Sequence, residues 1–230
     1  MEDIIVDDLL NKIIKGVFTP DLPLPSENSL SRRFNVSRMM VRKAYGQLEE
    51  RGYIRSIRGK GRFLFEPKQH VLLDLRSDMS FTEKLKAMGT ELVTHNIEVK
   101  AVDYNSKIWS SLEADRNEQV FSVMLMRLLN KEPIAIHTSY LRAALFPDIW
   151  REGRSIISMY SYLSEHGYSN FSSTNTTMNV TLPTLQEQEV MGCPSLVPLL
   201  LLEYETTCQQ IPVIQYNKIV YRSDRFKYRI

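Results

Sequence analysis

The sequence predicts an α+β protein with a small helical region at the front and a larger region built on a mainly antiparallel sheet. Helical spacing of apolar residues in three short stretches before residue 50, followed by a Gly-containing hairpin, indicates the first region. Apolar strands mixed with short helices indicate the second, larger region. Charge divides the chain too, because residues 28–65 carry a net charge of +8, whereas the 17 basic and 18 acidic residues from 68 onward nearly cancel. We therefore expect domains at 1–67 and 78–230, joined by a linker at 68–77.

Composition places the chain among ordinary globular proteins, with 43% hydrophobic and 24% charged residues. No apolar run approaches the roughly 18 residues of a membrane-spanning helix. The opening "MEDIIVDDLL" is acidic where a secretory signal is basic, so we expect a cytoplasmic protein that does not contact membranes. Cys193 and Cys208 have neither metal-site nor redox spacing, and we expect two thiols, no metal and no cofactor.

The first helix is predicted over residues 4–14, where Ile5, Leu9 and Ile13 share one face. Gly16 and three prolines then end it. Its acidic residues give the front of the chain a negative charge that contrasts with the basic segment that follows.

Two further helices follow in close succession. Ser26 is a good N-cap for a short helix, and Glu27 suits the helix dipole. After a tight turn, Ser37 caps a helix that runs to about Glu50 and stops at Gly52. The buried stripe of this third helix is formed by Val41, Ala44, Tyr45 and Leu48. Arg38 and Arg42, four residues apart, occupy another face near the helix start, where a helix-turn-helix contacts the major groove.

A basic β-hairpin is predicted after the third helix. Its strands cover 53–57 and 62–65, and its tip is Arg58-Gly59-Lys60-Gly61. Glycines at the tip allow the backbone to approach another surface closely. Three helices followed by such a hairpin describe a winged helix-turn-helix.

The motifs "LPSENSL", "NVSRMMVRKAYGQLEERGYI" and "RGKGRFL" resemble, in order and spacing, the DNA-binding domain of the GntR family of bacterial transcription regulators. The resemblance covers residues 4–65. It implies that Ser37, Arg38 and Arg42 contact phosphates and base edges in the major groove of double-stranded DNA. It also implies that the tip, with Arg58, Gly59, Lys60 and Gly61, lies at the minor groove. Asn28 stands where family members often carry a basic residue.

The second region alternates between strands and helices. Strands "VFSVMLMRLLN" and "EPIAIHTSYLR" flank a turn at 130–132, and the last hairpin turns near 209–211. Helices are predicted in "SFTEKLKAMG", in "SIISMYSYLSEHGY" and in "PTLQEQEVMG". The candidate acid and base groups His137, His166, Glu203 and Glu205 have no nucleophile elbow, metal spacing or phosphate loop beside them, so no catalytic residue is predicted.

This order of segments, with the closing "YRSDRFKY", resembles the UTRA effector-binding domain of the HutC subfamily of GntR regulators, whose fold is that of chorismate lyase. The resemblance implies a ligand pocket formed by eight residues: Phe81, Thr82, Arg127, His137, Ser158, Tyr160, Gln215 and Tyr221. A hydroxyl at a helix N-terminus and a guanidinium suit a small anion such as a sugar phosphate. Leu125 stands where sugar-phosphate responders often carry a second Arg, and they tend to have acids in place of His137 and Gln215. The ligand class therefore stays open.

The sequence thus predicts a homodimeric, ligand-responsive repressor on a palindromic operator. Two alternatives remain: an enzyme of chorismate lyase-like fold with an appended DNA-binding domain, and a non-specific architectural DNA binder. Turnover of a bound ligand would favour the enzyme. Equal affinity of the protein for random and operator duplexes would favour the architectural DNA binder.

Overall fold

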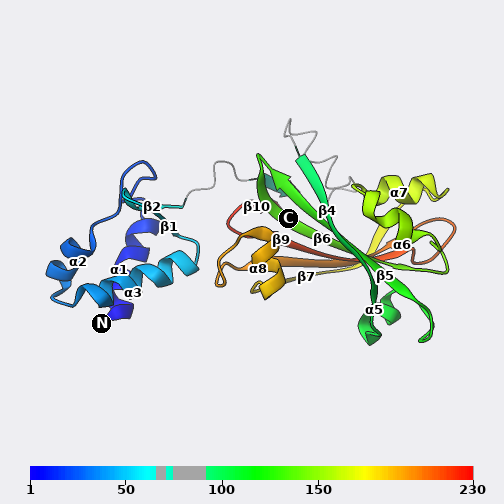
Figure 1. Cartoon of the computed structure of the whole chain (residues 1–230), viewed down its shortest axis with the longest axis horizontal. Helices are drawn as coiled ribbons and strands as arrows, with labels where there is room; N and C mark the ends of the chain where they lie inside the picture. Colours follow the sequence, from blue (N-terminus) through cyan, green and yellow to red (C-terminus); the bar gives the residue numbers. More distant parts are fainter. Residues whose placement is uncertain (66–70, 75–91, 230) are drawn as a thin grey trace.

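The computed structural model describes residues 1–65, 71–74 and 92–229. Within them the fold is α+β, with a helical region that precedes a mainly antiparallel six-stranded sheet (Figure 1). The predicted helix at 80–89, with Phe81 and Thr82, lies outside the described residues.

The three predicted N-terminal helices are present as α1 (Glu2–Ile14), α2 (Glu27–Phe34) and α3 (Arg38–Glu50). Both predicted caps form, because Ser26 accepts a hydrogen bond from the Ser29 amide and Ser37 accepts one from the Met40 amide. Each such cap contributes about 1 kcal/mol. Asn35 ends α2 in the left-handed conformation (φ 53°), which forms the tight turn between the helices.

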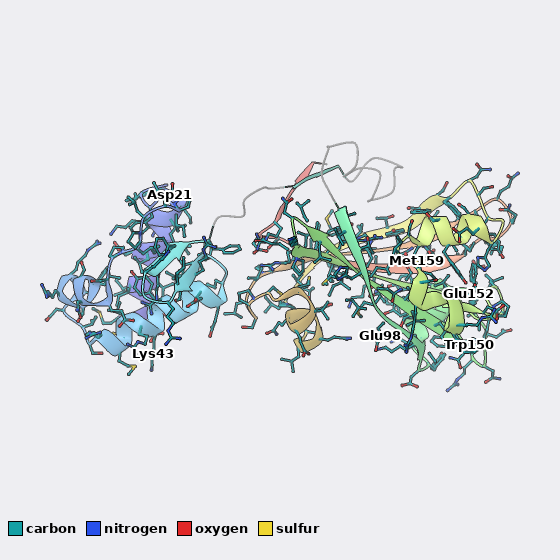
Figure 2. The ribbon with its side chains drawn as sticks, turned by 45° about the horizontal axis from the view of Figure 1, so that its top comes forward. Asp21, Lys43, Glu98, Trp150, Glu152 and Met159 are labelled. Carbon is teal, nitrogen blue, oxygen red and sulfur yellow. The ribbon has the colours of Figure 1, made fainter. Side chains whose placement is uncertain are left out.

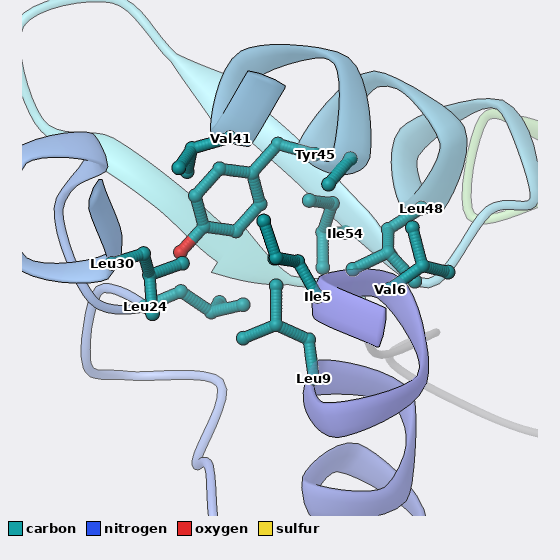
Figure 3. Packing of buried hydrophobic residues seen from close by; sticks show 10 residues of the cluster. Ile5, Val6, Leu9, Leu24, Leu30, Val41, Tyr45, Leu48 and Ile54 are labelled. Carbon is teal, nitrogen blue, oxygen red and sulfur yellow. The ribbon is translucent and has the colours of Figure 1, made fainter. Parts of the chain in front are cut away.

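One hydrophobic core joins these helices to the hairpin (Figure 3). It contains Ile5 and Leu9 of α1, Leu30 of α2, and the predicted α3 stripe around the fully buried Tyr45. Each buried aliphatic side chain stabilises the fold by about 1.5–3 kcal/mol relative to its exposed state. The Tyr45 hydroxyl donates to the Pro25 carbonyl, so the proline-rich loop before α2 is fixed to α3.

The predicted hairpin forms from β1 (Ile54–Ile57) and β2 (Gly61–Leu64), paired antiparallel with Ile57 opposite Gly61. Gly59 and Gly61 have φ values of +76° and +108°, which favour glycine. The region is therefore a winged helix-turn-helix.

The second region is built on an antiparallel sheet in the order β4-β5-β6-β9-β8-β7. Its strands are β4 (Leu92–Val102), β5 (Val120–Leu129), β6 (Glu132–Arg142), β7 (Ser172–Thr181), β8 (Leu199–Thr207) and β9 (Gln215–Arg222). Between them lie α5 (Ser106–Ser111), α6 (Ile149–Glu152), the short 3-10 helix η1 (Gly153–Ser155), α7 (Met159–Glu165) and α8 (Leu185–Met191).

Helices pack on both faces of this sheet. On one side, here called the α7 face, α6 and α7 cover Val123, Leu125 and Leu141, and Met159 belongs to the same core (Figure 2). On the opposite face, α8 packs against Ile136 and Val220 through Met191, and α5 packs nearby through Trp109. Because side chains alternate along a strand, each strand contributes to both cores.

Both predicted hairpins of this region are confirmed. β5 and β6 turn at Asn130 and Lys131, whose φ values of 49° and 68° suit a two-residue turn. β8 and β9 pair antiparallel around the predicted turn near 209–211. Cys193 and Cys208 are free thiols.

Two predicted elements are shorter than expected. The helix predicted from residue 155 begins only at Met159, because Ser158 adopts an extended conformation (φ −143°) and caps it. The last strand does not run on to the C-terminus. Arg222 pairs with Asp224 at 2.8 Å, and the chain turns there into β10 (Phe226–Arg229). That strand pairs in parallel with β3 (Val71–Asp74), which lies inside the predicted linker.

Candidate functional site

The arginines predicted to contact DNA lie at the start of α3 and point into solvent. The side chains of Arg38 and Arg42 are 62% and 60% exposed, and the adjacent Lys43 is exposed as well (Figure 2). Ser37 precedes them as the exposed N-cap of the helix. A helix start with this charge can enter a DNA major groove and contact phosphates or guanine edges.

A single carboxylate organises this basic surface. Glu27, whose side chain is only 12% exposed, accepts hydrogen bonds from Arg42 at 3.3 Å and from Arg62 of β2 at 3.0 Å. Arg38 lies 3.8 Å from the same carboxylate. The hydrogen bond from Arg42 holds the pKa of Glu27 below its usual value. We call Glu27, Arg38, Arg42 and Arg62 the Glu27 cluster.

The Glu27 cluster has more positive than negative charge, so it remains attractive to phosphates. It also fixes the hairpin beside the recognition helix, because Arg62 follows the hairpin tip directly and its guanidinium lies over the Tyr45 ring at 4.5 Å. Sequence reasoning missed Glu27 as a member of this surface and did not predict its ion pair with Arg62. The available signal in the sequence was the position of Glu27, an acid directly before the basic segment at 28–65.

The hairpin tip has the predicted exposed, basic character. Arg58, Gly59, Lys60 and Gly61 are all exposed. The Lys60 amide donates to the Ile57 carbonyl at 3.0 Å, which closes the turn. Among the described residues, no atom beyond Gly59 and its two chain neighbours lies within 4 Å of the position that a Gly59 side chain would occupy, so the tip is open to a partner.

The described residues of the predicted effector pocket lie on the α7 face, and Arg127 is the one arginine or lysine among them. Arg127 is 5% exposed. Its guanidinium donates to the Thr94 hydroxyl and, at 3.0 Å, to the Ile157 carbonyl just before α7. Its Nε has no hydrogen-bond partner among the described residues. Burial lowers the pKa of Arg127 to about 10, which leaves it charged at neutral pH.

Nothing of opposite charge balances Arg127 within residues 92–229, since no carboxylate there forms an ion pair with it. A buried cation with only neutral partners is energetically costly. An anionic ligand would remove that cost.

Two more predicted residues lie near this guanidinium. Tyr221 shares its face, since Ala135 is the register partner of both Arg127 and Tyr221. His137, on the same side of β6, is 8% exposed and makes an edge contact with the Tyr221 ring at 5.9 Å between centroids. Burial, and then the charge of Arg127, holds the pKa of His137 well below its usual value. His137 is therefore neutral in the folded protein.

The start of α7 contributes the next pair. Ser158 is the N-cap of the helix and also accepts a hydrogen bond from the Ser161 hydroxyl at 3.0 Å. Tyr160 packs against Phe171 with ring centroids 5.1 Å apart. The Ile157 carbonyl that accepts from Arg127 fixes this end of α7 to β5.

Gln215 lies toward the other end of the α7 face. It is six residues from Tyr221 along β9, which is about 20 Å for an extended strand. Its amide nitrogen donates to Thr206 at 3.1 Å, and its buried oxygen has no partner among the described residues. The predicted pocket residues therefore extend along the face instead of forming one compact group.

Thr94 and Tyr204 are additional candidates that sequence reasoning missed. Thr94 contacts Arg127 directly, and Tyr204 lies close enough to influence the electrostatics of Arg127. Burial raises the pKa of Tyr204, so its hydroxyl stays protonated and can donate to a ligand. Both residues lie on strands far from residue 127 in sequence, and only the sheet brings them together.

None of the helices in 1–65 and 92–229 is long and apolar enough to cross a membrane. In the same residues no group of three or more His, Cys, Asp or Glu side chains could hold a metal ion.

Similar proteins have the same organisation. The family of bacterial regulatory proteins, gntR family, matches residues 2–64, and the UTRA domain matches residues 87–227. The HTH-type transcriptional repressor NagR of Bacillus subtilis is 27% identical over 97% of this chain and 91% of its own length. The repressor MngR of the mannosyl-D-glycerate transport/metabolism system of Escherichia coli is 24% identical over 98% and 93%.

Solved structures share the fold. PhnF from Mycobacterium smegmatis superposes with a TM-score of 0.60 at 20% identity, covering 98% of both chains. YydK of Bacillus subtilis, described as a possible transcriptional regulator, has a TM-score of 0.57 at 20% identity, covering 98% of this chain and 97% of its own. NagR and MngR are named as repressors and YydK as a possible transcriptional regulator, so the family and these relatives indicate a transcription regulator and not an enzyme. This chain belongs to the GntR family of bacterial transcription regulators and carries a UTRA domain.

Proposed function

We propose that the protein represses transcription as a homodimer on a palindromic operator, and that a small anionic metabolite bound on the α7 face controls its DNA binding. Residues 1–67 form the DNA-binding domain, 68–77 the linker, and 78–230 the effector-binding and dimerisation domain.

The DNA-binding half of this proposal rests on the Glu27 cluster and the hairpin tip. Ser37, Arg38 and Arg42 contact the major groove, and the tip residues Arg58 to Gly61 contact the minor groove. Two-fold symmetry of the dimer matches two half-sites, which makes the operator palindromic. Specific binding then exceeds binding to random duplex by on the order of 10³ or more.

The single observation that carries the effector half is the buried Arg127, which has no charged partner among the described residues. A phosphate or carboxylate can accept together from a terminal nitrogen of Arg127 and from its Nε, which has no partner among the described residues. In this proposal the hydroxyls of Ser158, Tyr160 and Tyr221 donate hydrogen bonds to such an anion, and Phe81, Thr82 and His137 are further ligand contacts. Gln215, about 20 Å from Tyr221 along β9, contacts only a ligand long enough to extend along the α7 face. A sugar phosphate or another small anion fits this chemistry.

The ligand controls DNA binding only if it binds the operator-competent and the operator-incompetent arrangements with different affinity. That difference arises at the start of α7, because the Ile157 carbonyl and the ligand both accept hydrogen bonds from the guanidinium of Arg127. A ligand that draws Arg127 toward itself alters the contact that fixes α7 to β5.

A thermal-shift screen tests the effector class. We expect members of a panel of sugar phosphates, phosphonates and small carboxylates to raise the melting temperature, and the matching neutral sugars to have no effect. Stabilisation by neutral sugars as strong as by their phosphates would contradict the proposal.

A further inference from the structure

The two edge strands of the six-stranded sheet differ in their solvent exposure and in their charge. β7 forms one edge and pairs only with β8 among the described residues. Nine of its ten residues are exposed, so both of its faces and its outer edge are open. A long open edge exposes unpaired N–H and C=O groups that can pair with another strand.

The sequence of β7 does not protect this edge. "SSTNTTMNVT" has no charged residue, no proline and no glycine, and its threonines and valine favour strand structure. One protective feature is present, a bulge between Thr174 and Thr177 where Asn175 has a φ of 49°. Beyond the bulge, residues 177–181 pair with β8 in regular register.

The opposite edge differs because it carries charge. The exposed residues of β4 include the apolar Val93 and Ile97 but also Lys100, which forms an ion pair with Glu98 at 2.6 Å. Charged side chains on an edge strand oppose edge-to-edge association. The difference between the two edges indicates that β7 is an association surface.

Apolar side chains continue from the regular half of β7. Met178 and Val180 are 43% and 73% exposed, and Leu182 and Leu185 just beyond are 53% and 83% exposed. Met178 and Val180 lie on the same face of β7, two residues apart, and exposed apolar side chains that lie side by side mark contact sites.

We propose that residues 177–181 of β7 pair antiparallel with the same residues of a second copy of this chain, across a two-fold axis. The sheet then continues from one subunit into the other, and the nearby apolar side chains of both copies cover each other. An uncharged strand suits such pairing, because the two-fold axis brings no like charges together. This inference rests on the dimer in the proposed function and names its contact surface.

Sedimentation equilibrium of the full-length chain tests it with a matched pair of variants. Val180→Asp places one negative charge on β7 of each subunit, and we expect the dimer dissociation constant to rise by at least about tenfold. Val93→Asp makes the same change on the exposed part of β4, and we expect the wild-type dissociation constant. Unchanged melting temperatures of both variants establish that each subunit still folds.

The possible results show whether the β7 contact alone is wrong or the proposed dimeric repressor is wrong as well. A Val180→Asp variant that dimerises as tightly as the wild type overturns the β7 contact while the dimeric repressor stands. A wild-type chain that stays monomeric on its operator overturns both. As a second measurement, a cysteine placed singly at residues 177, 179 and 181 should allow a short bis-maleimide to link two chains at one position at least. Absence of cross-linking beyond the wild-type level at all three positions also overturns the β7 contact.

Discussion

Arginine has opposite environments in the two halves of the molecule. In the helical region Arg38 and Arg42 are about three-fifths exposed and lie around a shared carboxylate. On the sheet, Arg127 is 5% exposed and has only neutral partners among the described residues. The exposed arginines suit a long polyanion with many phosphates, whereas the buried one suits a small anion that can enter the protein. Burial, more than residue type, distinguishes the two kinds of anion site.

The largest expected effect is at the buried arginine. Arg127→Ala should weaken effector binding by about 2–5 kcal/mol, because it removes a desolvated charge that pairs directly with the ligand. Isothermal titration with the effector found by the thermal-shift screen measures this. Arg151→Ala, which removes an exposed arginine of α6, is the control and should leave ligand affinity unchanged. Equal losses in both variants would contradict a specific role for Arg127.

Loss of an exposed arginine should have a smaller effect, and on DNA binding. Arg38→Ala or Arg42→Ala should each cost about 1–3 kcal/mol in affinity for the cognate operator if the residue contacts a base. A loss that is equal on random duplex would instead identify a phosphate contact, and the salt dependence of binding should then become less steep. Unchanged gel-shift affinity in both variants would exclude the start of α3 from the groove.

His137 should make the stability of the folded protein depend on pH. Its folded-state pKa is depressed, so the unfolded chain binds a proton that the folded chain does not as the pH falls below the unfolded value near 6.5. The wild type should therefore lose up to about 1.4 kcal/mol of stability per pH unit below that value, relative to His137→Gln. Urea unfolding of both proteins at pH 7.5 and 5.5 measures the difference. Identical pH dependence in the two proteins would show that His137 does not titrate on unfolding.

The smallest effect concerns the scaffold of the exposed site. Ser26→Ala removes the cap of α2 next to Glu27 and should cost about 1 kcal/mol of stability. Operator affinity at a temperature well below unfolding should change little, because the Glu27 carboxylate keeps its arginine partners. Ser29→Ala is a useful control, since its backbone amide, not its side chain, makes the cap hydrogen bond.

Prediction from sequence worked best where structure is local. Caps at Ser26 and Ser37, the α3 stripe and the Asn130 turn all depend on residues within a few positions of each other. β7 carried no alternating pattern because both of its faces are exposed, and it was missed. β3 and β10 were missed because their pairing joins distant ends of the chain. The partners of Arg127 and the role of Glu27 were missed for the same reason, since tertiary contacts create them.

The most direct test of the central claim is a crossed titration of one pair of variants. Operator binding and effector binding are measured on Arg42→Ala and on Arg127→Ala, each beside the wild type. We predict that Arg42→Ala loses operator affinity and keeps effector affinity. Arg127→Ala should keep operator affinity without effector and lose the response to it. If either variant impairs both activities equally, or if the effector still changes operator binding by Arg127→Ala, the division of labour between exposed and buried arginines is wrong.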